Sequence, residues 1–276
     1  MTSADFPGII FLNIKNLDTF LEEKPVLYKY MPLEHALITL SKKQFWLSDP
    51  KKWPDPFEAR FLKAKYSDTG GNEIDSQFQN GTFATCLTRE RYNEAQWIAY
   101  SKESIAVRFD IDTKILLEQL SQYAIKNSFH VYFGQVEYHK KEDIEVKNIN
   151  MIPFDAEKGK GAMKICRDVT SPDFCARLLL LKRQDFAYEN EMRIIVIKDI
   201  ADTSKGTFFK YYCDNKDLIR SLMISPKAEE QTVSMLKEYI AQKFDLPPKV
   251  DKNGVARTII QRYRLYDEEN DAKITV

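Results

Sequence analysis

The chain has 276 residues, of which 43% are hydrophobic and 30% charged, and its 41 basic residues balance 41 acidic ones. A net charge of +0 removes any overall electrostatic attraction to nucleic acid or to an anionic membrane, although local patches stay open. No stretch approaches the ~18–20 apolar residues that a membrane span needs, and the first twenty residues do not resemble a signal peptide. We therefore expect a single domain over residues 1–276, located in the cytoplasm, with no membrane partner.

The cysteines and histidines indicate no metal site. The four cysteines contain no CxxC pair, and the three histidines are scattered along the chain. GxGxxG and GxxxxGK[ST] are also absent, so neither a Rossmann nor a P-loop nucleotide site is supported by a motif.

In the first half of the chain, hydrophobic periodicity predicts alternating short elements. Leu33, Ala36, Leu37 and Leu40 recur at helical spacing, and Asp112 is a suitable N-cap for a later helix. The predicted strands cover residues 26–30, 45–48, 81–87 and 104–109, and the predicted helices cover 33–40, 93–100 and 112–124.

The second half continues this alternation. The Ser-Pro pairs at 171–172 and 225–226 are typical helix starts, because serine caps and proline fits the first turn. The predicted elements are a strand over 131–138, a helix over 171–181, a strand over 191–198 with a hairpin partner over 206–212, a strand over 218–224, a helix carrying Val233, Leu236, Ile240 and Phe244, and a strand or mixed segment over 258–266.

The irregular connections favour an α+β fold with a mixed, mainly antiparallel sheet and flanking helices over a doubly wound parallel sheet. We expect a core over about 26–198 and a C-terminal strand-helix-strand extension over about 206–266.

The LYKY motif places a lysine between two tyrosines on a strand. Alternation puts Leu27 and Lys29 on one face and Tyr28 and Tyr30 on the other. Such a lysine can present a cation beside an aromatic surface, or can simply extend its ammonium from a half-buried edge strand to water.

Polar and aromatic side chains also follow the strand over 81–87. Thr88 lies where this strand ends, which is a usual place for a functional hydroxyl. Trp97 and Tyr100 are three residues apart on the next helix, so they form either part of the core or a stacking surface.

Two segments supply candidate carboxylates. Asp55 and Glu58 are three residues apart, which suits substrate positioning, a metal carboxylate pair, or an Asx-turn at Asp55 beside a helix-capping or surface glutamate. Glu191 and Arg193 share one face of an otherwise apolar strand. A carboxylate there is costly unless it faces a cleft or is paired, and an ion pair of Arg193 with Glu191 or Glu189 is the simpler interpretation.

Taken in order, LYKY, FWLSDP, PDPFE, CLT, WIAY and YENEMRI resemble the pattern of a bacterial family catalogued as domain of unknown function 2971. The resemblance spans roughly residues 27–197. Three positions depart from the pattern, with Pro54 in place of asparagine, Thr88 in place of serine and Met192 in place of tryptophan.

The order of a basic residue, a hydroxyl and a late glutamate is also similar to that of ADP-ribosyltransferases. This similarity implies an enzyme that binds NAD and cleaves its glycosidic bond, with Lys29 anchoring NAD, Thr88 bracing the pocket and Glu191 stabilising the oxocarbenium-like transition state. Tyr28 or Tyr30 would stack on nicotinamide, and Trp97 would complete the cofactor-binding set.

Such an enzyme would fit a bacterial toxin or phage-defence effector, with a protein or nucleic-acid acceptor and an antitoxin or other regulatory protein as partners. A metal-dependent nuclease is an alternative, in which Asp55, Glu58, Glu189 and Glu191 hold Mg²⁺ and Lys29 or Lys182 steadies a phosphate. A non-catalytic binding or regulatory module is the third hypothesis.

Overall fold

The structure is a computed structural model. It describes residues 3–55, 57–63, 66–67, 73–74, 80–102, 105–140, 143, 171–199, 206–210, 218–244, 249–250, 256–257 and 260–263.

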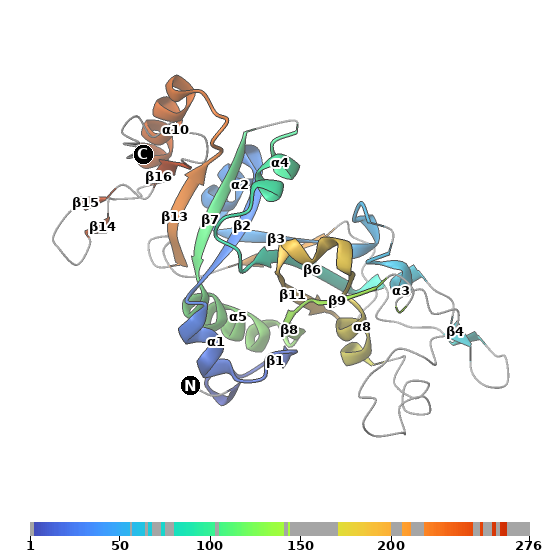
Figure 1. Ribbon diagram of the computed structural model, residues 1–276. Coiled ribbons are helices and arrows are strands. Elements are labelled where there is room, and N and C mark those ends of the chain that lie inside the picture. The colour runs from blue at the N-terminus through green and yellow to red at the C-terminus, as the bar shows by residue number, and fades with distance from the viewer. Residues whose placement is uncertain are drawn as a thin grey trace, which may run out of the picture.

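One large mixed sheet organises the chain (Figure 1). Its main path runs β1-β8-β11-β6-β2-β7-β13-β16, and β3 branches from β6 and pairs with β12. The strands of this sheet are β1 (Ile9–Leu12), β2 (Val26–Pro32), β3 (Gln44–Ser48), β6 (Thr82–Thr88), β7 (Ala106–Asp112), β8 (His130–Gln135), β11 (Glu191–Ile197), β12 (Gly206–Lys210), β13 (Ile219–Ile224) and β16 (Ile260–Arg262). All pairings in it are antiparallel except β1 with β8 and β13 with β16, which confirms the predicted α+β class.

Short helices and two-stranded ribbons surround the sheet. The α-helices are α1 (Leu17–Glu23), α2 (Leu33–Lys42), α3 (Arg60–Lys63), α4 (Glu94–Tyr100), α5 (Thr113–Asn127), α8 (Pro172–Leu178) and α10 (Glu230–Phe244). The 3-10 helices are η1 (Ser3–Asp5), η2 (Pro50–Lys52) and η6 (Gln184–Glu189). The ribbon strands are β4 (Tyr66–Ser67), β5 (Glu73–Ile74), β9 (Glu137–His139), β10 (Leu181–Arg183), β14 (Lys249–Val250) and β15 (Ala256–Arg257). Within the described ranges, no helix is long and apolar enough to cross a membrane.

Side-chain caps explain several helix starts. Asp112 accepts a hydrogen bond from the Ile115 amide at 2.9 Å and begins α5, as predicted. Ser171 caps α8 through the Phe174 amide at 3.1 Å, with proline at the first helical position.

Three predicted boundaries or pairings are wrong. The predicted helix over 171–181 ends at Leu178, because the chain then pairs with β9 as β10. The predicted helix at Ser225 begins only at Glu230, because the Ser225 amide still bonds the Ala106 carbonyl beside the sheet at 2.9 Å. The strand over 206–210 pairs with β3 and not with β11, because both edges of β11 are already occupied by β6 and β8.

The predicted strand over 131–138 is divided into β8 and β9, and periodicity did not predict β1 or α1. The predicted segment over 258–266 contains β16, while positions 258–259 and 264–266 lie outside the described residues.

The sheet separates two apolar cores. Helices α1, α2 and α5 cover one face with side chains such as Phe20, Leu40 and Leu116. On the other face, Leu180 after α8 packs against β8, and Gly134 in β8 permits this approach. A Cβ atom on Gly134 would lie 2.5 Å from the Leu180 Cδ1 atom, so this position accepts no larger side chain without movement.

The sheet splits along one edge of β6. Thr88 pairs with Tyr28 of β2, and Ala84 pairs with Ser48 of β3. Between these two contacts, the Lys29 ammonium donates to the Cys86 carbonyl at 3.0 Å. Beside this split, the carboxyl end of β6 meets the first residues of β11 and β2, and a pocket opens there.

Candidate active site

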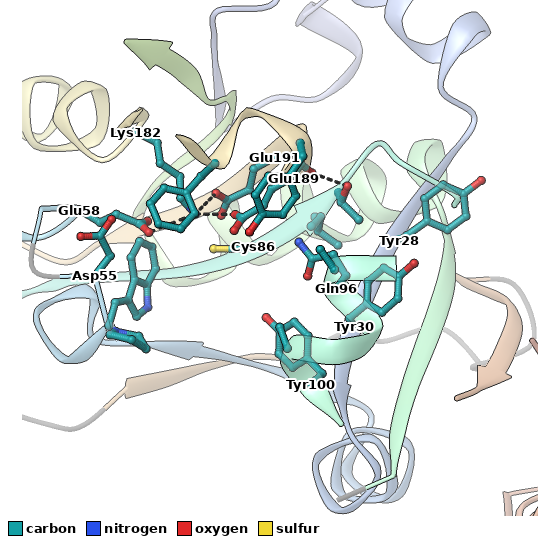
Figure 2. Close-up of a pocket in the computed structure, with 18 of the residues that line it drawn as sticks. Tyr28, Tyr30, Asp55, Glu58, Cys86, Gln96, Tyr100, Lys182, Glu189 and Glu191 are labelled. Atoms are coloured by element: carbon teal, nitrogen blue, oxygen red, sulfur yellow. Dashed lines mark hydrogen bonds and ion pairs between the residues drawn. The ribbon is translucent and has the colours of Figure 1, made fainter. Parts of the chain in front are cut away.

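A pocket of about 640 Å³ opens between the carboxyl end of β6, the start of β11 and helix α4 (Figure 2). This volume lies within the usual range of small-molecule sites. One wall is polar and contains Asp55, Glu58, Cys86, Lys182, Glu189 and Glu191. The facing wall contains Tyr28, Tyr30, Gln96, Ala99 and Tyr100.

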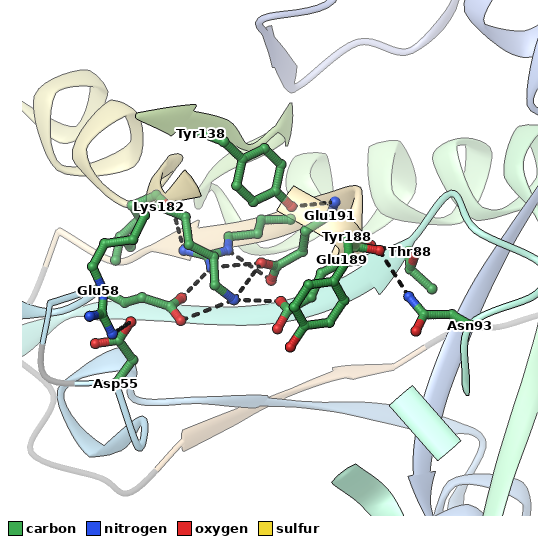
Figure 3. Close-up of polar contacts among 12 residues, drawn as sticks. Asp55, Glu58, Thr88, Asn93, Tyr138, Lys182, Tyr188, Glu189 and Glu191 are labelled. Atoms are coloured by element: carbon green, nitrogen blue, oxygen red, sulfur yellow. Dashed lines mark hydrogen bonds and ion pairs between the residues drawn. The ribbon is translucent and has the colours of Figure 1, made fainter. Parts of the chain in front are cut away.

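Three carboxylates of the polar wall converge on one ammonium (Figure 3). Lys182 Nζ lies 3.1 Å from Glu58 Oε1, 2.5 Å from Glu189 Oε2 and 3.2 Å from Glu191 Oε2. We call this group, together with Arg193, the carboxylate cluster. Its three carboxylates and two cations leave one excess negative charge at the pocket wall.

Arg193 holds Glu191 in place from behind. Its Nε and Nη2 atoms donate to the two Glu191 oxygens at 3.0 and 2.8 Å, and Nη2 also bonds Glu58. The Glu191 amide donates to the Tyr138 hydroxyl at 2.9 Å. With so many partners and 3% exposure, the Glu191 carboxylate is fixed in position and ionised before any ligand binds.

The electrostatics of the two neighbouring glutamates differ. Burial opposes ionisation of Glu191, but Arg193 and Lys182 outweigh it and lower its pKa to about 2. Burial raises the pKa of Glu189, and Lys182 offsets this only in part. The Glu189 side chain is 18% exposed, and among the described residues none bonds its second oxygen, Oε1. Glu189 is therefore the cluster member best placed to exchange a proton with a ligand.

The backbone between these glutamates is shaped by Asn190 and Thr88. Asn190 adopts the left-handed conformation at φ 41°, which asparagine tolerates, and so turns the chain from η6 into β11. The Thr88 hydroxyl donates to the Glu189 carbonyl at 2.6 Å and accepts from the Glu90 amide at 3.0 Å. Thr88 lines the pocket, but its hydroxyl is used to hold the Glu189 backbone.

The structure places the LYKY residues on opposite sides of β2. Tyr28 and Tyr30 line the pocket, whereas Lys29 is not among the lining residues. The Lys29 ammonium donates to Thr85 Oγ1 at 2.6 Å and to the Cys86 carbonyl, and burial lowers its pKa. Lys29 thus lies behind the pocket wall and not on it.

Trp97 is also outside the pocket lining. It is 2% exposed and packs edge-to-face on Tyr30, with ring centroids 4.8 Å apart. Tyr100, three residues further along α4, stacks on the same Tyr30 ring with centroids 6.5 Å apart and lines the pocket. Trp97 therefore supports the aromatic wall, while Tyr100 forms part of it.

Asp55 and Glu58 have different environments. Asp55 accepts from the Phe57 amide at 3.0 Å, which is the Asx-turn arrangement, and pairs with Arg183 at 3.1 Å. Glu58 is 8% exposed and belongs to the carboxylate cluster, so the interpretation of Glu58 as a surface residue is wrong. The simple Glu191–Arg193 ion pair is confirmed, although it is buried in a larger network.

Three residues have roles here that differ from those expected from the sequence. Lys182 is expected only as a phosphate contact, Tyr100 is expected with Trp97 in the core or in a stacking surface, and Gln96 has no expected role. The spacing of Gln96, Ala99 and Tyr100 at i, i+3 and i+4 predicts that Gln96 and Tyr100 share one face of their helix. Lys182 gave no such signal, because its partners lie elsewhere in the chain.

The sequence has no match among curated proteins at a significant level. Two solved structures show a distant likeness to the chain. Thermus sp. 2.9 DarT in complex with ADP-ribosylated ssDNA has a TM-score of 0.37 and 8% identity, covering 88% of this chain and 95% of that one. Thermus sp. 2.9 DarT in complex with NAD+ has a TM-score of 0.33 and 10% identity, covering 88% of this chain and 96% of that one.

A family model matches residues 96–194. The matched segment includes WIAY and YENEMRI, the motifs that carry Tyr100, Glu189 and Glu191, and it includes Lys182. It thus contains most of the ionised groups of the pocket, while LYKY, PDPFE and CLT precede it. Over residues 96–194, the chain is similar to the family described as Protein of unknown function (DUF2971).

Proposed function

We propose that the pocket binds NAD and cleaves the bond between its nicotinamide and ribose groups, in the manner of an ADP-ribosyltransferase. One observation carries this proposal: Glu191 is held as a fixed, ionised carboxylate in a wall with excess negative charge, opposite an aromatic wall. Cleavage of this bond builds positive charge on the ribose carbon. A fixed carboxylate stabilises that charge, and loss of such a group typically costs ~10²–10³ in rate.

The proposed step breaks one bond, forms one bond and transfers one proton. The bond between the ribose carbon and the pyridinium nitrogen breaks, and its electron pair neutralises the leaving nicotinamide. A hydroxyl or amine of the acceptor, or water, donates a lone pair to the ribose carbon. Glu189 takes the proton that this nucleophile releases, because its carboxylate has a raised pKa and an oxygen that bonds no described residue.

Other pocket residues suit the remaining parts of NAD. Tyr28 and Tyr100 provide aromatic surfaces for the bases. Lys102 is exposed at the pocket and, within the described residues, forms no ion pair, so it is suited to the pyrophosphate. We assign Lys29 and Thr88 positioning roles in this scheme, because their polar atoms bond the backbone of β6 and η6.

The nuclease alternative has weaker support from the geometry. The point on which Glu58, Glu189 and Glu191 converge is occupied by the Lys182 ammonium, which lies where a metal ion would have to bind. Asp55 is paired with Arg183 and does not join them. In the part of the chain that the structure describes, no group of three or more His, Cys, Asp and Glu side chains could hold a metal ion.

We further propose that such an NAD-consuming enzyme acts as a toxin or phage-defence effector, with a regulatory protein as its partner. The acceptor would be a protein or a nucleic acid, and both classes can be tested with fractionated cell lysate.

The first experiment is to incubate the purified protein with NAD, with and without lysate, and to measure nicotinamide release. We expect release by the wild type and a loss of at least 100-fold in Glu191→Gln. Glu118→Gln is the matched control, because Glu118 lies on the exposed surface of α5 in a pair with Lys114. The absence of both nicotinamide release and NAD binding would reject the proposal and favour the binding-module hypothesis.

A further inference from the structure

Helix α4 presents one face to the pocket. Gln96, Ala99 and Tyr100 line it at i, i+3 and i+4, while Trp97 points into the core. Figure 2 shows the Gln96 carboxamide and the Tyr100 ring on the side of the pocket opposite the glutamates.

This helix is tied to the opposite wall. The Asn93 side chain caps α4 by accepting from the Gln96 amide at 3.1 Å. The same side chain donates to the Tyr188 carbonyl at 2.9 Å, in the 3-10 helix that carries Glu189. The position of Gln96 relative to the carboxylate cluster is therefore fixed by hydrogen bonds.

The two walls differ in whether their polar groups are hydrogen-bonded within the protein. The Glu191 oxygens are bonded to Arg193 and Lys182. In contrast, the Gln96 carboxamide and the Tyr100 hydroxyl have no hydrogen bond to any residue that the structure describes. Desolvation in the pocket and the nearby Glu191 and Glu189 carboxylates raise the pKa of Tyr100, so its hydroxyl stays a donor.

We propose that Gln96 is the specificity residue of the pocket and reads the donor–acceptor edge of a planar base through its carboxamide. A carboxamide side chain both donates and accepts, so it pairs with a matching edge through two hydrogen bonds. Within NAD this edge is the carboxamide of nicotinamide or the amino edge of adenine. This inference rests on the proposed NAD binding and adds the group that selects the ligand.

The carboxylate cluster adds to the same selection. A ligand with a carboxylate in place of the nicotinamide carboxamide would lose a donor to Gln96. Its negative charge would also be repelled by the excess negative charge of the pocket wall. The wild type should therefore prefer NAD to nicotinic acid adenine dinucleotide.

The test compares the wild type with Gln96→Met, which keeps a similar side-chain length but removes both hydrogen-bonding groups. Ile98→Met is the matched control, because Ile98 is exposed on α4 outside the pocket lining. Isothermal titration gives the affinities for NAD, nicotinic acid adenine dinucleotide and nicotinamide hypoxanthine dinucleotide. The last ligand replaces the adenine amino group by a carbonyl. Urea unfolding confirms that all three proteins are folded.

We expect Gln96→Met to lower the preference for NAD over one of the two analogues by about tenfold, and Ile98→Met to leave both preferences unchanged. A changed preference over the nicotinic acid analogue assigns Gln96 to nicotinamide, and a changed preference over the hypoxanthine analogue assigns it to adenine. Unchanged preferences in Gln96→Met, with NAD still bound and cleaved, would overturn this inference alone. A wild type that binds no NAD would overturn it together with the proposed function.

Discussion

Thr88 and Glu191 lie directly opposite each other in the antiparallel pairing of β6 with β11. The Thr88 hydroxyl reaches past this pair to the Glu189 carbonyl at 2.6 Å. One threonine on the middle strand thus fixes the backbone that carries both glutamates facing the pocket. Tyr28 is the partner of Thr88 on the other side, so β2, β6 and β11 align three pocket residues in one row.

This relationship predicts different results for two Thr88 variants. Thr88→Ser keeps the hydroxyl and should retain most activity. Thr88→Val removes the hydrogen bond and leaves the partly buried Glu189 carbonyl without this donor, which should cost about 1 kcal/mol of unfolding free energy and shift Glu189. Urea denaturation and nicotinamide release check the two effects. Equal activity in the two variants would show that the hydroxyl does not position Glu189.

Arg193 should be essential to folding. It is 0% exposed, and Arg193→Met would leave the Glu191 and Glu58 carboxylates buried with too little positive charge. Breaking a buried pair in this way typically costs about 3–5 kcal/mol. Arg220→Met removes an exposed pair with Asp112 and should cost at most about 1 kcal/mol. Equal destabilisation of the two variants, measured by chemical denaturation, would contradict this account.

Lys182→Met should turn the carboxylate cluster into a cation site. Without the ammonium, Glu58, Glu189 and Glu191 would offer several oxygens around one point, which suits a hard cation such as Ca²⁺. We expect Ca²⁺ to raise the melting temperature of this variant. It should not raise that of the wild type or of Lys114→Met, whose lysine is exposed on α5. Thermal unfolding with and without Ca²⁺ tests this. The same change in melting temperature in all three proteins would contradict the convergence of the three glutamates on Lys182.

We expect Glu191 and Glu189 to contribute with opposite sign to the pH dependence of the unfolding free energy. The pKa of Glu191 is lowered to about 2 in the folded state, so its contribution is complete above its unfolded pKa and is lost as the pH falls. The pKa of Glu189 is raised, so its ionised form is disfavoured by folding and its contribution has the opposite sign.

We expect the unfolding free energy of the wild type to fall between about pH 5 and 2 more steeply than that of Glu191→Gln. Urea denaturation at a series of pH values measures both slopes. Parallel slopes would mean that Glu191 is not held ionised by Arg193 and Lys182.

Local sequence signals were sufficient for many elements. Alternating apolar residues identified the central strands, and Asp112 and Ser171 marked helix starts that their side chains cap. Strand partners were harder to predict, as the segment over 206–210 shows. Its pairing with β3 depends on which strand edges are unoccupied, and periodicity contains no such information.

The sequence by itself determined the fold class, the amphipathic helices and the alternation that puts Glu191 beside Arg193 on one face of β11. Only the tertiary structure decided that Glu58 and Lys182 join them, that Lys29 lies behind the wall, and that Gln96 faces the glutamates. The physical reason is range. Periodicity and capping act over a few residues, whereas Glu58 meets Arg193 across 135 positions, through a buried ion pair that forms only when the sheet is assembled.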